Sequence, residues 1–118
     1  MQELIEKVEQ WAEDKGIDKA ENWRPQFKKI VEEVMEYKEE LKLSEHDTVA
    51  NLMDEMTEMG DILVTLAIMA QQRGYRLNTC LQFAYDKIKD RQGEVINGSF
   101  VKAEDVGKVR KDSEEVTE

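Results

Sequence analysis

The scarcity of helix-breaking residues is the feature that most constrains this chain. Its 118 residues include one proline, Pro25, and six glycines, whereas Glu, Lys, Leu and Met are frequent. In a helix interior proline costs about 3 kcal/mol and glycine about 1 kcal/mol relative to alanine, so long segments without either favour helices. The length suits one domain with a single core. We therefore predict an all-α fold.

Apolar residues recur at helical spacing in four segments that are separated by turn and capping residues. These apolar stripes, which include Trp11, Met53 and Met56, are expected to pack in the core. Gly16 is expected to end the first helix, and Pro25 suits the first turn of the second. Ser44 or Asp47 can cap the third helix at its N-terminus. The expected helices are residues 4–16, 25–41, 49–73 and 78–92. Together they predict a four-helix bundle-like architecture.

The period changes after the fourth helix. Asn97-Gly98 stands between two short apolar runs, a strong signal for a tight β-hairpin. The segment that follows is acidic and poor in apolar anchors, so we expect residues 106–118 to be a flexible tail. The predicted domain therefore spans residues 1–105, with a short C-terminal hairpin.

The charge balance excludes several classes of function. With 27 acidic and 17 basic residues the net charge is −10, which would repel a nucleic-acid backbone, so we expect no nucleic-acid partner. The apolar run at 62–70 is about half the length that a bilayer requires, so no membrane association is expected. Cys80 is the single cysteine and the N-terminus lacks a signal core, which favours a cytoplasmic protein.

Two acidic pairs point to metal chemistry. Glu33 and Glu36, and then Glu58 and Asp61, are three residues apart in the middle of expected helices, which places each pair on one helix face. Nine acidic pairs have this spacing, so spacing alone is weak evidence. Asp61, however, opens the apolar run, and Gly60 beside it is unfavourable in a helix and suggests close approach of a helix or a ligand. Converging carboxylates suit hard divalent cations.

Three other interpretations of the acids can be weighed, of which two remain open and one fails. A non-catalytic acidic helical protein, such as a DNA mimic or a regulator-binding module, would fit the net charge but would spread its acids over an exposed face. Simple ion pairs with neighbouring lysines such as Lys28, Lys29 and Lys38 are also possible. A di-iron bundle requires Glu-x-x-His pairs, and the single histidine, His46, does not form one.

The order E-x-x-E then E-x-x-D resembles the signature of the MazG-like nucleoside triphosphate pyrophosphohydrolases, in the all-α NTP pyrophosphatase superfamily. The resemblance extends to the doubled acid at Glu32, to Gly60-Asp61, and to the basic segment at 86–91. Residues 91–102 are similar to short versions from Gram-positive bacteria and their phages. The resemblance covers residues 3 to 105, and Trp23-Arg24-Pro25 departs from the usual pattern.

This resemblance implies a MazG-type fold that hydrolyses (d)NTPs to (d)NMP and pyrophosphate with Mg²⁺, for which Mn²⁺ can substitute. A dUTP-specific or phosphoribosyl-ATP-specific member of the superfamily is an alternative. A homodimer or homotetramer is expected, because small bundles bury their remaining apolar surface by self-association. The implied metal ligands are Glu33, Glu36, Glu58 and Asp61. The implied catalytic carboxylates are Glu32, Glu33 and Glu36. The implied substrate contacts are Gln26, Lys29, Asp86, Lys87, Arg91 and Lys102, with Trp23 a candidate to stack on the base.

Overall fold

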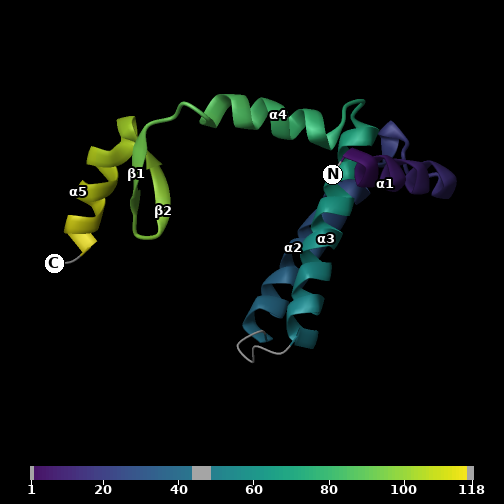
Figure 1. Cartoon of the computed structure of the whole chain (residues 1–118), viewed down its shortest axis with the longest axis horizontal. Coiled ribbons are helices and arrows are strands. Elements are labelled where there is room, and N and C mark those ends of the chain that lie inside the picture. Colours follow the sequence, from purple (N-terminus) through teal and green to yellow (C-terminus); the bar gives the residue numbers. More distant parts are fainter. Residues whose placement is uncertain (1, 44–48, 117–118) are drawn as a thin grey trace. The chain divides into compact units, whose positions relative to one another are not determined.

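The computed structural model describes residues 2–43 and 49–116, with side chains through residue 112. The described chain is mostly helical and contains one small antiparallel sheet, in agreement with the predicted all-α class (Figure 1). The elements are α1 (Gln2–Lys15), η1 (Ala20–Asn22), α2 (Trp23–Leu43), α3 (Val49–Gln72), α4 (Leu77–Ile88), β1 (Gly93–Ile96), β2 (Ser99–Lys102), η3 (Ala103–Asp105) and α5 (Val106–Val116). The proposed caps Ser44 and Asp47 lie outside the described residues. No described helix is both long and apolar enough to cross a bilayer.

The chain divides into two compact units, Met1–Leu81 and Gln82–Glu118, so the division falls inside α4. The domain boundary near residue 105 stays a prediction. Residues 106–116, which the sequence predicts as a flexible tail, form helix α5. Its half-buried Val106 and Val109 are three residues apart on one helix face, and Arg110 forms an ion pair with Glu94 of β1. Contact with the hairpin therefore supplies the apolar and ionic partners that the tail composition did not suggest.

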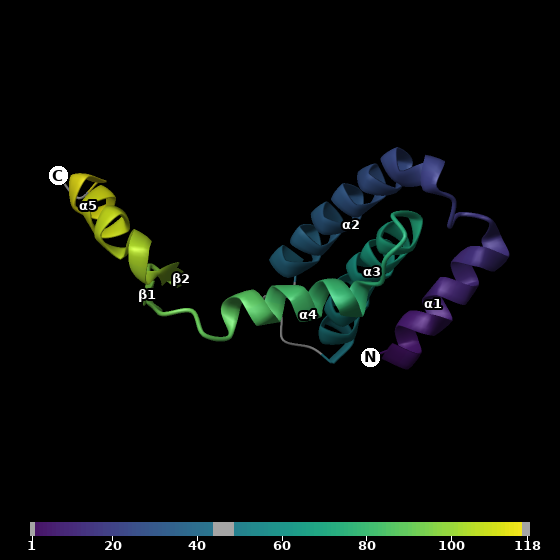
Figure 2. The same ribbon diagram turned by 90° about the horizontal axis from the view of Figure 1, so that it is seen from above.

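In the first unit, α3 lies between α1 and α2 (Figure 2). Helices α2 and α3 form an antiparallel pair, and α1 packs against α3 on the other side. As predicted, α1 stops near Gly16, whose φ of 73° is a left-handed conformation that glycine adopts without strain. The amides of Gly16 and Ile17 donate to the carbonyls of Glu13 and Ala12, which closes the last turn.

The apolar core of the first unit is small. Five apolar residues are buried, and none of the described large side chains is fully buried; the five are Ile5, Ala12, Ala67, Ile68 and Ala70. Many of the large apolar side chains that the sequence assigns to the core are exposed, which corrects that prediction. Met53 and Met56, expected as core filler, are 62% and 64% exposed, and Trp11 is 49% exposed. The reason is that α2 and α3 meet through a different, more polar face.

Polar side chains supplement this small core by clamping α3 to its neighbours. Gln26 on α2 donates from Nε2 to the Thr65 carbonyl at 3.0 Å, and Gln72 donates to the Ile17 carbonyl at 2.7 Å. The Arg76 guanidinium contacts both carboxylate oxygens of Glu9, with the shorter bond at 2.6 Å. Charge-assisted bidentate pairs of this kind fix geometry as well as adding energy. These bonds set the position of α3, and with it the position of the candidate site.

The second unit contains the predicted hairpin. Strands β1 and β2 pair in a register that sets Ile96 opposite Ser99, and the turn residues Asn97 and Gly98 have φ values of 52° and 81°. Positive φ at both central turn positions is the geometry that an Asn-Gly turn favours. The predicted hairpin is therefore confirmed at its turn and its strands.

Gly93 begins the hairpin at a position where a side chain has no room. A Cβ at Gly93 would collide with the Val101 carbonyl and with the Phe100 ring. We expect Gly93→Ala to destabilise the second unit by roughly 1–3 kcal/mol, the usual cost of overpacking. Amide NMR spectra should show the loss of hairpin signals. The control is Gly107→Ala, because an added Cβ there meets no atom within 4 Å; equal behaviour of the two variants would contradict the expectation.

Candidate metal centre

The seam between α2 and α3 is largely polar and includes four acidic residues. Half-buried or buried residues recur along both helices at alternating spacings of three and four, which identifies the two faces that meet. On α2 these positions are Gln26, Ile30, Glu33, Tyr37 and Glu40. On α3 they are Asn51, Glu55, Glu58, Ile62, Thr65, Met69 and Gln72. Carboxylates thus occupy the part of the seam where a helical pair normally places apolar side chains.

Three of these acids converge. Carboxylate oxygens of Glu33, Glu36 and Glu58 all lie within 4.8 Å of one another, two from α2 and one from α3. Glu33 and Glu58 are half-buried, and Glu36 is exposed. The antiparallel pairing of the helices therefore brings together the two motifs that the sequence separates by 21 residues.

The cluster is short of hydrogen-bond donors and positive charge. The Oε2 atoms of Glu33 and Glu58 are buried and have no hydrogen-bond partner among the described residues. The Glu33 side chain is 12% exposed, and the cation paired with it is Lys29, whose Nζ lies 4.0 Å from Glu33 Oε1. Buried carboxylate oxygens without partners are costly. A bound cation, a proton or a water molecule would compensate them.

The local environment raises the pKa of two of these acids. Burial raises the pKa of Glu33, and a hydrogen bond with Glu36 and the negative charges of Glu36 and Asp61 raise it further. Burial also raises the pKa of Glu58, with the charges of Asp61 and Glu36 adding to the effect. Both shifts mean that the ionised cluster is destabilised in the absence of a cation.

Two of the predicted site residues, Asp61 and Glu32, are not part of the converging group of three glutamates. Asp61 is half-buried at the start of the apolar run, and its charge acts on both Glu33 and Glu58. The group of mutually close ligand atoms, however, contains the three glutamates without it. Asp61 therefore stays a predicted fourth ligand. Glu32 is exposed on α2 beside Glu33, and its role toward a water molecule or a second ion stays a prediction.

The expected substrate residues of the first unit have partners within the chain. Gln26 is buried, and its amide nitrogen is used to hold Thr65, so its position already has a structural explanation. Lys29 lies beside Glu33 and also projects toward solvent. Trp23 is partly exposed, and the Arg24 guanidinium lies over its ring at 5.1 Å from the centroid. Such stacking leaves one face of a ring for other contacts.

The other expected substrate residues belong to the second unit, where each is described with its own neighbours. Asp86 accepts a hydrogen bond from Gln82 at 3.0 Å, and Lys102 lies 3.9 Å from Glu104. Lys87 is exposed and Arg91 is half-buried. Their roles toward a substrate stay predictions.

Sequence reasoning missed two acids that act on the cluster. The negative charges of Glu40 and Asp54 contribute to the raised pKa of Glu58. Glu40 lies seven residues after Glu33, and Asp54 lies four before Glu58, so each continues a helix face that carries a ligand. Following the spacing beyond the two motifs would have found both.

Comparison with known proteins gave no relative for this chain: no family model, curated protein or solved structure matched it. A functional proposal therefore depends on the motifs and on the geometry of the carboxylate cluster.

Proposed function

We propose that this protein is a Mg²⁺-dependent nucleoside triphosphate pyrophosphohydrolase, which cleaves (d)NTPs to (d)NMP and pyrophosphate. The proposal is carried by the meeting of Glu33, Glu36 and Glu58 across the α2–α3 seam, with two buried oxygens that have no hydrogen-bond partner among the described residues. The order and type of these acids resemble the motifs of the MazG-like hydrolases, which act on this class of substrate.

The residues present fit a hard divalent cation. All of the converging donors are carboxylate oxygens, which Mg²⁺ and Mn²⁺ prefer to nitrogen or sulfur ligands. Glu33, Glu36 and Glu58 would hold the ion, with Asp61 completing the set. Such an ion, when bound, neutralises phosphate charge and lowers the pKa of a coordinated water.

Other side chains of this chain are candidates for accepting the proton of the attacking water and for contacting the nucleotide. Glu32, exposed next to the cluster, is the candidate base that accepts a proton from the attacking water. Lys29 adjoins Glu33 and can contact a phosphate oxygen. The free face of Trp23 is the candidate to stack on the nucleotide base. Gln26 is better explained as a helix clamp.

The position of the acids argues against the non-catalytic alternative. A protein that mimics DNA needs its negative charges on an exposed face, where a basic partner can reach them. Glu33 and Glu58 instead lie half-buried between two helices, where burial lowers their value as surface charges. The seam arrangement therefore favours a cation site.

The proposal is tested with a panel of nucleotides that includes dUTP and phosphoribosyl-ATP. Reaction with Mg²⁺, Mn²⁺ or EDTA should be followed by ion-exchange separation of NMP and pyrophosphate from NDP and phosphate. We expect NMP and pyrophosphate from at least one nucleotide, and no turnover in EDTA. Failure of every nucleotide with both metals would refute the enzymatic proposal, and release of NDP and phosphate would refute cleavage at the α-phosphorus.

A further inference from the structure

One face of α3 is apolar and uncovered. Met56 is 64% exposed at its centre, and the residues on this face follow a helical period. They lie on the side of α3 away from Glu58 and Asp61, which face the seam. We call this surface the outer face of α3; its residues are Val49, Leu52, Met53, Met56, Met59, Gly60 and Leu63.

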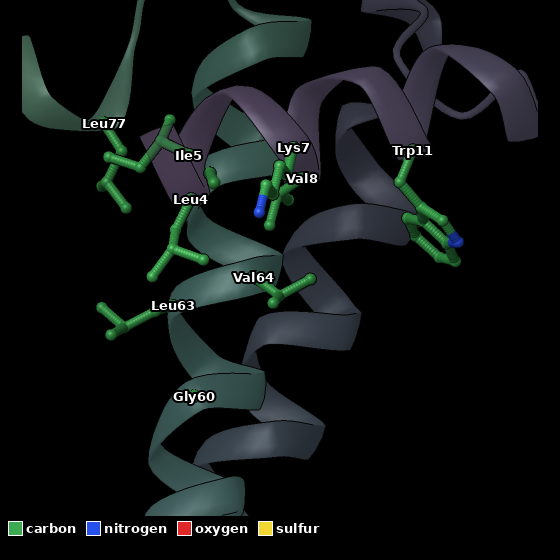
Figure 3. A pocket seen from close by; sticks show the side chains of 10 residues that line it. Leu4, Ile5, Lys7, Val8, Trp11, Gly60, Leu63, Val64 and Leu77 are labelled. Carbon is green, nitrogen blue, oxygen red and sulfur yellow. The ribbon is translucent and has the colours of Figure 1, made fainter. Parts of the chain in front are cut away.

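Hollows flank the outer face on both sides. Toward α2, a groove of about 350 Å³ is formed by Tyr37 with Met56, Met59 and Leu63. Toward α1, a cavity of about 530 Å³ is formed by apolar side chains that include Leu4 and Trp11, as Figure 3 shows. Gly60 and Leu63 line both hollows. The hollows extend the apolar surface of the outer face on both sides, and one charged residue lines each of them, Lys7 toward α1 and Glu55 toward α2.

Gly60 lies at the centre of this surface and has no explanation within the described chain. It is the twelfth of the 24 residues of α3, and a Cβ built on it meets no atom within 4 Å. Glycine is unfavourable in a helix interior. A glycine in such a position is explained when another backbone approaches it closely, and here that backbone must come from outside the described residues.

We propose that a second copy of this chain covers the outer face, with the two α3 helices crossing antiparallel at Gly60. A two-fold interface uses the same patch on both subunits, and a crossing at the helix midpoint satisfies that condition. Such a crossing sets Met56 near the partner's Val64. The glycine then allows the close approach of the two helices.

The apolar area and the charge of the outer face fit a second copy of this chain. Eight exposed apolar side chains contribute: Leu4, Trp11, Val49, Leu52, Met53, Met56, Met59 and Leu63. At about half of the 60–120 Å² that burial energies imply for each, they offer roughly 240–480 Å². A stable interface buries about 800 Å² per partner, of which about 60% is apolar. The outer face carries no charged residue, so it offers nothing for a charged foreign partner to recognise.

Sedimentation equilibrium of the full chain tests the proposal. We expect a dimer for the wild type and a dissociation constant raised on the order of 30-fold or more by Met56→Lys. The control Gln10→Lys should leave the dimer unchanged, because Gln10 is exposed on α1 and lines neither hollow. Gly60→Leu should also dissociate the dimer, although it adds apolar surface. A wild-type monomer would assign the face to another occupant, in this chain or in a foreign protein, and would overturn the proposal. A Gly60→Leu dimer of unchanged or greater affinity would overturn the crossing.

Cross-linking supplies a test that does not depend on a destabilised variant. In a Cys80→Ser background, Gly60→Cys should form an intermolecular disulfide with diamide, because the two Cα atoms must lie within about 7 Å. Gln10→Cys, exposed on α1 and outside both hollows, should remain monomeric on a non-reducing gel. Equal cross-linking of the two variants would contradict the crossing at Gly60. The inference is independent of the proposed function, because the metal cluster lies on the opposite face of α3.

Discussion

Replacing Glu58 by glutamine is expected to lower Mg²⁺-dependent nucleotide hydrolysis on the order of 100-fold or more. Glu58 is the member of the converging group that α3 contributes, so its loss leaves the cluster with ligands from one helix. Groups that merely orient a metal ligand already cost 10–100-fold when they are removed. Glutamine keeps the shape of the side chain and removes the charge. Initial rates of pyrophosphate release at saturating nucleotide measure the effect.

Glu39→Gln is the matched control for this experiment. It makes the same chemical change on α2, but Glu39 is exposed and paired with Lys42 at 3.1 Å. We expect its rate to stay within about twofold of wild type, since exposed ion pairs contribute little. A Glu58→Gln protein that keeps the wild-type rate would show that the cluster is not the site of catalysis.

Glu32→Gln separates the roles of base and ligand. If Glu32 accepts the proton of the attacking water, its removal should lower the rate by about 10²–10⁴-fold. Metal affinity, measured by calorimetry with Mn²⁺, should change little, because Glu32 lies outside the converging group. A parallel loss of affinity and rate would instead make Glu32 a ligand.

The sequence allowed the helices and the motif acids to be predicted, because both depend on local spacing. Residues three apart on a helix lie on one face, so the pairing of Glu33 with Glu36 follows from the helix alone. The approach of Glu58 depends on how α3 packs on α2, and the sequence offered only the order of the motifs as a guide. The structure supplies that approach, with the three carboxylates within 4.8 Å.

The choice of packing face could not be predicted for a physical reason. Periodicity reveals that a helix has an apolar face, but not what covers that face. We assigned Met53 and Met56 to the core of the chain, whereas the helices meet through Glu33, Tyr37 and Glu58. In the sequence, the polar residues of such a seam cannot be distinguished from those of a solvent-exposed helix face. Helix α5 was missed for a related reason, because its partners in the hairpin are not local in the sequence.

Replacing Glu33 by glutamine is expected to stabilise the metal-free protein at neutral pH. Burial and neighbouring carboxylates raise the pKa of Glu33 above its usual value of 4.5. The folded state therefore holds a proton more tightly than the unfolded state does. Its stability should fall as pH rises from about 4.5 through the raised pKa, since in this window the unfolded state loses the proton first. Glutamine carries no charge to lose, so this pH dependence should weaken in the variant.

Divalent metal should reverse the order of stability, so that the wild type becomes more stable than Glu33→Gln. Mg²⁺ that binds the folded state at about 100 times its dissociation constant adds about 2.7 kcal/mol, or roughly 10 °C in Tm for a chain of this length. Wild type should gain this increment, and Glu33→Gln should lose most of it. Thermal unfolding at pH 5 and pH 7.5, in EDTA and in Mg²⁺, measures both effects, with Glu39→Gln as the control of equal charge. An equal Mg²⁺ increment in Glu33→Gln and wild type would mean that the buried Glu33 oxygen is not a ligand, and that a proton compensates it instead.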